Sequence, residues 1–418
     1  MKTYCKPSVV NIEDWKFNEL AVVECFRNKR SRNDFQHLLC KTGKITKREL
    51  MEDRLNKDFK RTLEAETEVA KMLTQHIIDR DLQLKPIRQF QRLDGLTHKL
   101  RDICQESPEQ QVFEYIGVYA LKPLFRAKIL PIQYGSIPKK GGVAGKRKIE
   151  RLLRRKFHGK VVAIKGDVTK AYPSVMVEVV MEMLRRDIGK NKVLLWFLGA
   201  LMSNYPGNHL CIGGYLPAWL FNYVMSYVLR YIYEQAQIRR GKRNRLVYAA
   251  VCYADDFTLY GDVSKLKKAM KKATVLAHDK FGLKIKDIWQ FYQVASFEEE
   301  RENLEQRRKG SKKRTPGVDM MGYVVRRRYT IIRGRVFRRI RRQVLRAWTD
   351  YNSKGYVPWW RACRIAAYKG WVKHSNSLYF RTKYCFDELF KLCSYSASKH
   401  GKEIENEKRI LLIAAISC

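Results

Sequence analysis

The chain has 418 residues, and its 84 Lys and Arg side chains against 42 Asp and Glu give a formal net charge of +42. This charge argues against an ordinary metabolic enzyme or protein-binding scaffold and is typical of a protein that binds phosphate backbones. Disorder does not explain it, because 45% of the residues are hydrophobic and 12% are aromatic. A chain of this length can bury a sizeable core, and we expect two or three lobes.

The cysteines and the apolar stretches indicate a reduced protein outside the membrane. The ten cysteines form no CxxC pair, which argues against a zinc site or a disulfide framework and for reduced thiols in the cytoplasm. Residues 1–16 lack the apolar core of a signal peptide. The longest apolar stretch, 215–229, is shorter than the roughly 20 residues that a bilayer requires. We therefore expect a buried helix there and no membrane partner.

Helices and one hairpin are expected in the first third of the chain. Residues 1–84 combine mixed-charge runs with apolar residues at helical spacing and predict a helical region. Arg88–Arg92 and Thr97–Cys104 flank Asp94-Gly95, a pattern that predicts two short strands joined by a tight turn. Helical spacing returns over 110–130. The apolar positions that support the first helical prediction are Ala65, Val69, Met72, Leu73 and Ile77.

Two segments hold much of the positive charge. Residues 133–146 predict a glycine-rich, basic loop that leads into a cationic helix, and 138–160 contain ten Lys or Arg against the single acid Glu150. Residues 301–346 contain seventeen Lys or Arg against three acids. Because apolar residues interleave with these arginines, we predict basic faces on folded elements rather than tails.

Three carboxylates follow predicted strands. The apolar run 160–166 places Asp167 at the carboxyl end of a strand, and 246–261 predicts strand, tight turn and strand with Asp255 and Asp256 at the tip. An isolated Asp-Asp pair is usually a solvated turn. Here apolar strands flank the pair, a third carboxylate ends another strand, and such acids are costly to hold together without cations. Magnesium prefers oxygen ligands of this kind, and two ions about 3.5–4 Å apart can activate a hydroxyl and stabilise a leaving pyrophosphate.

The carboxylate segments resemble two motifs of reverse transcriptases. Tyr253-Ala-Asp-Asp256 resembles their Y-x-D-D box, and Asp167-Val-Thr-Lys-Ala-Tyr172 resembles their first carboxylate motif. The resemblance continues in order along the chain from about residue 96 to residue 376. It implies an α+β fold shaped as a right-hand polymerase, with fingers, a palm of antiparallel strands backed by helices, and a helical thumb.

The same resemblance implies roles for individual residues. Asp167, Asp255 and Asp256 would be catalytic, and two Mg²⁺ ions would be held by Asp167 and Asp255 with the Val168 carbonyl and Asp256 as auxiliary ligands. Tyr172 stands where the family places a steric gate, whose ring leaves no room for a ribose 2′-hydroxyl. Tyr172 therefore favours dNTPs and DNA synthesis. The alternative is that Tyr172 is a core aromatic residue before Pro173.

Other motifs imply contacts with the incoming dNTP. Residues 210–225 resemble the loop and helix that pack beneath the templating base, with Gly213 in the loop, although Ile212 and Pro217-Ala218 depart from the Gln and Ser-Gln of many relatives. Lys99 and Arg101 match a cationic pair that clamps the triphosphate, and an ordinary surface strand is the alternative. Lys286 falls in a segment that resembles the lysine-bearing motif near pyrophosphate, where Lys284 is the alternative.

The basic segments imply nucleic-acid contacts. The loop from Gly141 to Lys146 resembles the family's glycine- and lysine-rich second motif, 319–325 resembles its primer grip, and 367–376 resembles the thumb of bacterial diversity-generating and related enzymes. Trp371 in that thumb motif reads as core rather than as a stacking platform. The residues expected to contact nucleic acid are Lys139, Lys140, Lys146, Gly322, Tyr323, Arg326, Arg338, Arg339, Arg342, Lys373 and His374.

The resemblance also implies a domain plan and a function. We expect an N-terminal helical extension over 1–84, fingers over 85–160, a palm over 161–325 with a fingers-like insertion near 190–215, and a thumb and tail over 326–418. The expected activity is RNA-templated DNA synthesis on a dedicated structured non-coding RNA in bacterial antiphage defence, with cDNA as product. A diversity-generating or retron-type enzyme is one alternative, and a catalytically idle RNA-binding protein on a polymerase fold is another.

Overall fold

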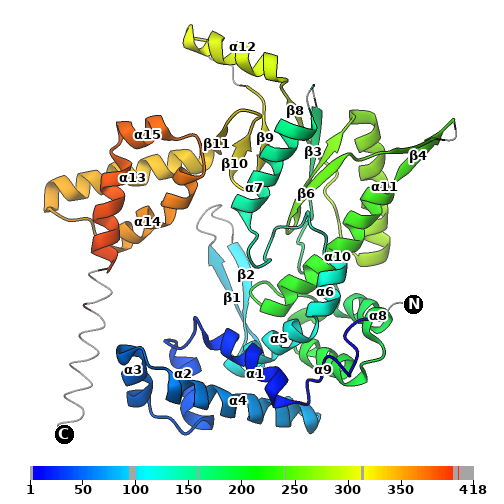
Figure 1. The fold of residues 1–418 in the computed structure, drawn as a ribbon, viewed down its shortest axis with the longest axis vertical. Coiled ribbons are helices and arrows are strands. Elements are labelled where there is room, and N and C mark those ends of the chain that lie inside the picture. The colour runs from blue at the N-terminus through cyan, green and yellow to red at the C-terminus, as the bar shows by residue number, and fades with distance from the viewer. Residues whose placement is uncertain are drawn as a thin grey trace. The chain divides into compact units, whose positions relative to one another are not determined.

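The computed structural model describes residues 3–93, 100–157, 159, 161–240, 242–311, 315–398 and 403 (Figure 1). These residues combine helices with antiparallel sheets, so the α+β prediction is confirmed. The helices are α1 Trp15–Phe26, α2 Asn33–Thr42, α3 Lys47–Asn56, α4 Lys60–Ile78, α5 Pro108–Ala120, α6 Lys122–Lys128, α7 Gly142–Arg151, α8 Val177–Ile188, α9 Lys192–Ser203, α10 Tyr215–Glu234, α11 Val263–Phe281, α12 Phe297–Arg308, α13 Gly334–Lys354, α14 Trp359–Lys373 and α15 Leu378–Lys383. A π-helical turn, Leu152–Lys156, continues α7, and a 3-10 turn spans Pro206–Asn208.

The strands form small sheets among the described residues. A four-stranded sheet has the order β6-β7-β3-β8, a three-stranded sheet has the order β11-β10-β9, and the pairs β1-β2 and β4-β5 are two-stranded. The β1-β2 pairing confirms the two strands that the sequence predicts, with Phe90 opposite Ile103, and the predicted turn at Asp94-Gly95 lies outside the described residues. The strand bounds are β1 Arg88–Leu93, β2 Leu100–Gln105, β3 Val161–Asp167, β4 Ala236–Arg239, β5 Lys242–Arg245, β6 Ala249–Tyr253, β7 Asp256–Gly261, β8 Gln290–Val294, β9 Val318–Met320, β10 Tyr323–Val325 and β11 Thr330–Ile332.

The chain falls into two compact units. The first unit comprises Met1–Lys139, Gly166–Phe257 and Asp262–Trp289, and the second comprises Lys140–Lys165, Thr258–Gly261 and Gln290–Cys418.

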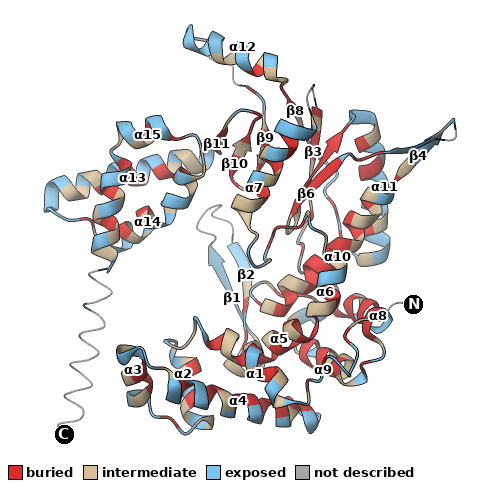
Figure 2. Cartoon of the chain, in the orientation of Figure 1, coloured by how far each residue is buried: buried red, intermediate tan, exposed pale blue. Residues whose placement is uncertain are grey.

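In the first unit, helices α1 to α4 occupy the N-terminal region that the sequence predicts to be helical. The spaced residues Ala65, Val69, Leu73 and Ile77 of α4 are all buried, which explains why α4 packs against α1 and α2. Helix α10 is buried over most of its length, as its apolar sequence predicts (red in Figure 2). No helix among the described residues is long and apolar enough to cross a bilayer.

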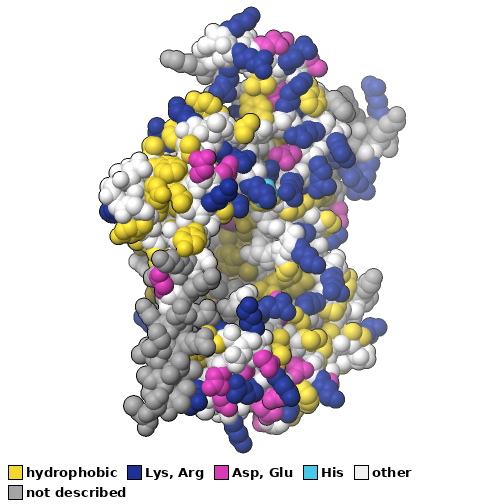
Figure 3. All heavy atoms as spheres, turned by 60° about the vertical axis from the view of Figure 1, so that its left-hand side comes forward, with side chains coloured by type: hydrophobic (Ala, Val, Ile, Leu, Met, Phe, Trp, Pro, Cys, Tyr) yellow, Lys and Arg dark blue, Asp and Glu magenta, His cyan; other side chains and the backbone are white. Residues whose placement is uncertain are grey.

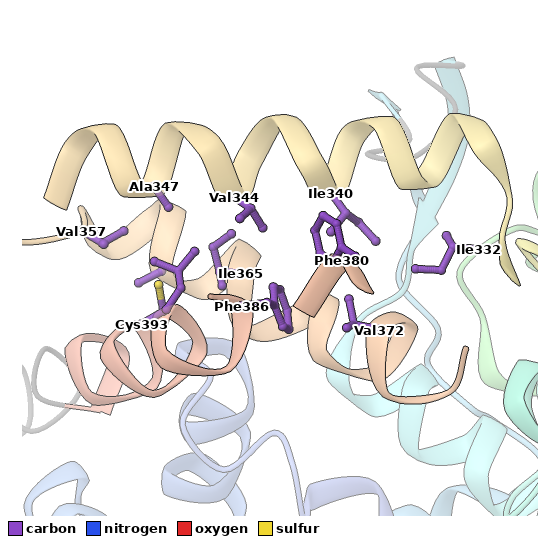
Figure 4. Packing of buried hydrophobic residues seen from close by; sticks show 12 residues of the cluster. Ile332, Ile340, Val344, Ala347, Val357, Ile365, Val372, Phe380, Phe386 and Cys393 are labelled. Atoms are coloured by element: carbon purple, nitrogen blue, oxygen red, sulfur yellow. The ribbon is translucent and has the colours of Figure 1, made fainter. Parts of the chain in front are cut away.

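In the second unit, helix α13 has one apolar face and one basic face. Ile340, Val344 and Ala347 follow helical spacing and point toward Ile365 of α14 and the aromatic ring of Phe386 (Figure 4). The prediction that these arginines lie on a folded element is confirmed.

The glycine-rich loop prediction is wrong at its C-terminal end. Helix α7 begins at Gly142, so Gly145 and Lys146 are helical. The buried Ile149 and Leu153 give this segment a core-facing side, which outweighs the low helix propensity of glycine. Gly141 precedes the helix at φ +96°, a backbone conformation that favours glycine.

Candidate active site

Asp255 and Asp256 lie at a two-residue hairpin turn. Strand β6 ends at Tyr253 and β7 begins at Asp256, so Ala254 and Asp255 form the loop. Ala254 has φ +53°. A non-glycine residue in this region costs about 1–3 kcal/mol, and such strain is typically retained at functional positions. We refer to residues 253–256 as the Asp-Asp turn.

The Asp-Asp turn is supported by the segment 132–135. This segment pairs with the edge of β6 through a parallel bridge between Gln133 and Cys252. Gly135 lies directly against the turn, because a Cβ atom at this position would be 2.4 Å from the backbone nitrogen of Ala254. Only glycine fits here without displacing the turn.

Two buried amide side chains stabilise this supporting segment. The Gln133 Nε2 atom donates to the Asn222 carbonyl at 2.8 Å, and the Asn222 Nδ2 atom donates to the Gly135 carbonyl at 3.0 Å. Both side chains are almost completely buried. Neither residue was expected to have this role, although a lone Asn in the apolar helix α10 is a signal that could have indicated one.

The structure brings Asp167 to the Asp-Asp turn. Strands β3 and β7 are neighbours in the sheet, and the Val168 amide donates to the Asp255 carbonyl at 3.3 Å. Burial raises the pKa of Asp255, and the charges of Asp256 and Asp167 raise it further. Asp255 is therefore close enough to both of the other predicted carboxylates to be repelled by them.

Lys286 and Arg101 bring positive charge to these acids. The Lys286 amide donates to the Asp167 carbonyl at 3.0 Å, and its ammonium group contacts Asp167 Oδ2. This contact raises the pKa of Lys286. The charge of Arg101 acts to lower the pKa of Asp255 and so opposes the effect of burial. Lys99, the other member of the predicted pair, lies outside the described residues.

Tyr172 lies beside Asp255 and is held by an aromatic contact. Its ring stacks on Phe221 of α10 with 5.0 Å between centroids and 24° between planes. The pKa of Tyr172 is raised to about 12, chiefly by burial and also by the charge of Asp255, while a hydrogen bond with Ser136 opposes this rise. The ring is thus fixed at the edge of the acidic group.

Gly213 lies against the hairpin β1-β2. It has φ +122°, and a Cβ atom there would be 2.6 Å from the Cys104 carbonyl oxygen. The Cys104 amide donates to the Ile212 carbonyl at 2.9 Å. The close approach that requires a glycine is therefore an approach to the protein's own strand β2.

The donor set at the turn fits magnesium in its chemistry. Three carboxylates, two of which raise the pKa of Asp255, together with a backbone carbonyl, are the hard oxygen donors that Mg²⁺ prefers. Within the described residues, no group of three or more acidic, histidine or cysteine side chains is already spaced to hold a metal ion. The ammonium group of Lys286 lies against Asp167 instead.

In the second unit, two residues expected to contact nucleic acid point inward. Lys146 is only 5% exposed, and its ammonium donates to Glu150 Oε1 and to the His374 carbonyl, each at 2.9 Å. Arg326 is equally buried, and its Nε atom donates to the Thr315 carbonyl at 2.7 Å. For these two side chains the expectation of a solvent-facing cation is wrong, because internal oxygen acceptors take their N–H groups.

Gly322 and Tyr323 are placed against Trp371. Gly322 has φ +78°, and a Cβ atom there would be 2.2 Å from the Trp371 ring. The Tyr323 ring lies 4.8 Å from the Trp371 ring. Trp371 is therefore a packing residue, as the sequence predicts.

Other predicted basic residues face solvent. Arg338 and Arg342 are exposed and four residues apart on α13, so they share a face, and Lys373 and Lys139 are exposed as well. Lys140, Arg339 and His374 are partly exposed. On the face drawn in Figure 3, Lys and Arg side chains visibly outnumber Asp and Glu.

Comparison with known proteins adds no family to this picture. No protein-family model matches the chain, and no curated protein matches it. The functional assignment therefore depends on the residues and their geometry.

Proposed function

We propose that this chain is an RNA-templated DNA polymerase of the reverse-transcriptase type. The observation that carries the proposal is the grouping of Asp167, Asp255 and Asp256 at neighbouring strand ends, with Tyr172 beside them. Acids grouped in this way are costly unless cations bind, and phosphoryl transfer uses such groups. The net charge of +42 supports a nucleic-acid substrate.

The proposed chemistry assigns a task to each group. Asp167 and Asp255 would hold two Mg²⁺ ions with help from Asp256 and the Val168 carbonyl. Magnesium bound there supplies neutralisation of the triphosphate and activation of the primer 3′-hydroxyl. Arg101 would bind the triphosphate. Lys286, which neutralises Asp167 in the structure, would give a proton to the leaving pyrophosphate.

Tyr172 would select the sugar. Its ring is fixed by Phe221 and would leave no room for a 2′-hydroxyl. We expect Tyr172→Ala to lower discrimination against ribonucleotides by about 10- to 100-fold, since steric selection in a pocket has this size. Tyr172→Phe keeps the ring and should keep the discrimination. Competition between dNTPs and NTPs in primer extension measures both, and equal discrimination by the wild-type chain and the Ala variant would refute the gate.

The proposal extends to the architecture and the template. The β1-β2 hairpin would belong to the fingers, the sheet β6-β7-β3-β8 to the palm, and α13 to α15 to the thumb of a right-hand polymerase. The template would be a dedicated structured RNA used in bacterial antiphage defence. A diversity-generating or retron-type enzyme would use the same site.

The decisive experiment replaces the acids of the turn. We expect Asp255→Asn/Asp256→Asn to lower dNTP incorporation about 10³-fold or more, because losing several kcal/mol of metal-borne stabilisation costs tenfold per ~1.4 kcal/mol. The control is the single substitution Asp262→Asn directly after the other end of β7, where Asp262 pairs with Lys265 at 2.9 Å. The control should retain incorporation.

Copurified nucleic acid completes this test. The chain and its variants are purified from a host that carries the flanking DNA, and the bound RNA and DNA are sequenced. One dominant RNA with complementary DNA that is lost in the Asp255/Asp256 variant would support a dedicated template. Incorporation that survives in this variant would refute the metal assignment, and RNA without cDNA in every sample would favour the binding-only alternative.

A further inference from the structure

A second basic feature of the first unit lies away from the Asp-Asp turn. Strands β4 and β5 follow α10 and precede β6 along the chain, and they form an antiparallel hairpin that projects on the right of Figure 1. Residues 235–246 contain five Lys or Arg and no acid. A two-stranded hairpin has little stability of its own in water. Contacts with other groups are therefore the best explanation for its presence. Arg243 and Arg245 are two residues apart and share one face of β5.

These two arginines line a cavity of about 750 Å³. Arg230, from the last turns of α10, lines it as well, and Glu234 is its one acidic lining residue among those described. Leu130, Pro131 and Tyr233 add apolar surface to the same wall. Arg243 and Arg245 are exposed, so an external ligand can reach them. We refer to this site as the arginine cavity.

Among the described residues, Arg230 and Arg243 of the arginine cavity donate to backbone carbonyls. Arg230 donates to the Lys128 carbonyl at 3.3 Å, and Arg243 donates to the Glu234 carbonyl at 3.1 Å. Within the described part of the chain, no carboxylate forms an ion pair with Arg230, Arg243 or Arg245. Backbone carbonyls satisfy single N–H groups and leave the net charge in place.

Some other arginines of the first unit pair with acids. Arg30 pairs with Glu66 at 2.7 Å, and Arg80 pairs with Glu13 at 2.8 Å. In such pairs a carboxylate of the same unit neutralises the guanidinium, so no external ligand is needed. The arginine cavity instead gathers three guanidinium groups with free donor positions beside an apolar wall, which is the arrangement that binds phosphate through forked hydrogen bonds.

We propose that the arginine cavity binds phosphodiester groups of a nucleic-acid strand that lies outside the catalytic site. Arg230, Arg243 and Arg245 would contact phosphates, and Tyr233 would contact a sugar or base. The cavity and the Asp-Asp turn adjoin opposite ends of β6: the Ala250 amide donates to the Tyr233 hydroxyl at 2.8 Å, and the turn follows Tyr253. Three strand steps lead from Ala250 to Tyr253, about 10 Å, and Asp255 follows two residues later in the turn. This binding does not depend on polymerase activity.

The test uses the salt dependence of binding by the full chain. Arg243→Gln/Arg245→Gln removes two cations from exposed positions and should leave folding unchanged. The matched control, Lys271→Gln/Lys272→Gln, removes two exposed cations from α11 of the same unit. Fluorescence anisotropy measures affinity for a labelled RNA hairpin, a single-stranded oligouridine and DNA oligonucleotides of the same lengths over a series of KCl concentrations. Thermal unfolding confirms that both variants fold.

The expected result is a smaller salt slope in the cavity variant alone. Each lost phosphate contact reduces the slope of log K against log salt by about 0.9 on duplex and about 0.7 on single strands, so two lost contacts give about 1.4–1.8. The probe whose slope changes identifies RNA or DNA as the source of the phosphates. Equal changes of this slope in both variants would mean that overall charge alone sets the salt dependence, and they would overturn the proposal.

Two further outcomes are informative. If the slopes for every probe stay unchanged while affinity for a polyglutamate peptide falls, the cavity binds acidic protein and the proposal is wrong. A chain without polymerase activity that still shows the expected slope change would support the arginine cavity and refute the proposed enzyme, so the two failures are distinguishable.

Discussion

Glu114 of the first unit and Arg327 of the second are both completely shielded from solvent, and neither has an ion-pair partner among the described residues. Burying an isolated charge is expensive unless the group changes its protonation or receives several hydrogen bonds. The two units solve this problem in different ways, because a carboxyl can take up a proton whereas a guanidinium keeps its charge.

The first unit holds Glu114 with N–H and O–H donors. Glu114 accepts from the Tyr215 amide at 2.6 Å, the Leu216 amide at 3.1 Å and the Tyr205 hydroxyl at 2.8 Å. The two amides begin α10, so Glu114 satisfies donors that a helix N-terminus leaves unpaired. Burial raises the pKa of the neighbouring Glu106 to about 10, and the charge of Glu114 adds to this rise.

The second unit surrounds its buried guanidinium with carbonyl oxygens. Arg327 donates to the carbonyls of Ala295 and Leu153, each at 2.5 Å, and contacts those of Phe157 and Gly159. Leu153 lies in the π-helical turn after α7, and Phe157 directly follows it, so these carbonyls belong to a helix end. A helix C-terminus leaves such carbonyls without partners and favours positive charge.

The largest effect is expected when the guanidinium is removed. Arg327→Met should lower the free energy of unfolding by about 3–5 kcal/mol, because the buried carbonyls lose their donors. The control Arg328→Met removes the neighbouring arginine, which is exposed and whose guanidinium lies 5.7 Å from the Phe297 ring. We expect a loss of less than about 1 kcal/mol for the control. Urea denaturation compares the two, and equal losses would show that Arg327 does not organise this helix end.

A smaller effect on the free energy of unfolding is expected when the buried acid Glu106 is replaced. The folded pKa of Glu106 is raised, from 4.5 to about 10, so the folded chain holds a proton that the unfolded chain releases. The associated stability is present below about pH 4.5 and is lost as the pH rises toward about 10. Glu106→Gln keeps a neutral side chain at every pH and should raise the free energy of unfolding at about pH 8 by about 1–3 kcal/mol.

The pH profile of unfolding separates this explanation from a general effect of charge. Glu182→Gln removes an exposed acid from α8 of the same unit and serves as the control. Denaturation is measured from acid to alkaline pH for both variants. If the free energy of unfolding of both variants changes with pH as steeply as that of the wild-type chain, Glu106 does not cause the pH dependence.

The comparison also shows which features the sequence could predict. Asp167 and the Asp255-Asp256 pair follow apolar strands, and a pattern of two strands and a turn determines where their side chains emerge. The placement of the three acids was therefore predictable, as was the apolar face of α13. These predictions depend on local periodicity.

Features that depend on distant partners were not predictable. Glu114 lies in a helix whose other acid, Glu109, is partly exposed, and Arg327 lies in a run of arginines, so neither pattern marks a buried charge. Their burial follows from amides and carbonyls that other segments supply. The burial of Lys146 was not predictable for the same reason, because one of its two acceptors is the distant His374 carbonyl.

The smallest effect on stability is expected at the exposed cations of α13, where the second unit presents charge instead of burying it. Arg338→Gln/Arg342→Gln should change the free energy of unfolding by less than about 0.5 kcal/mol. If these arginines contact the template–primer backbone, the slope of log K against log salt for a primer–template duplex should fall by about 1.8. Arg301→Gln/Arg307→Gln, an exposed pair on α12, is the control with the same change in charge.

Combining Arg338→Gln/Arg342→Gln with Arg243→Gln/Arg245→Gln tests whether the two surfaces bind independently. Two surfaces that bind different phosphates should give slope changes that add, because independent contacts release independent counterions. A combined change no larger than that of either pair would mean that only one surface binds the probe. A change at α12 equal to that at α13 would mean that net charge alone, and not the face of α13, sets the affinity.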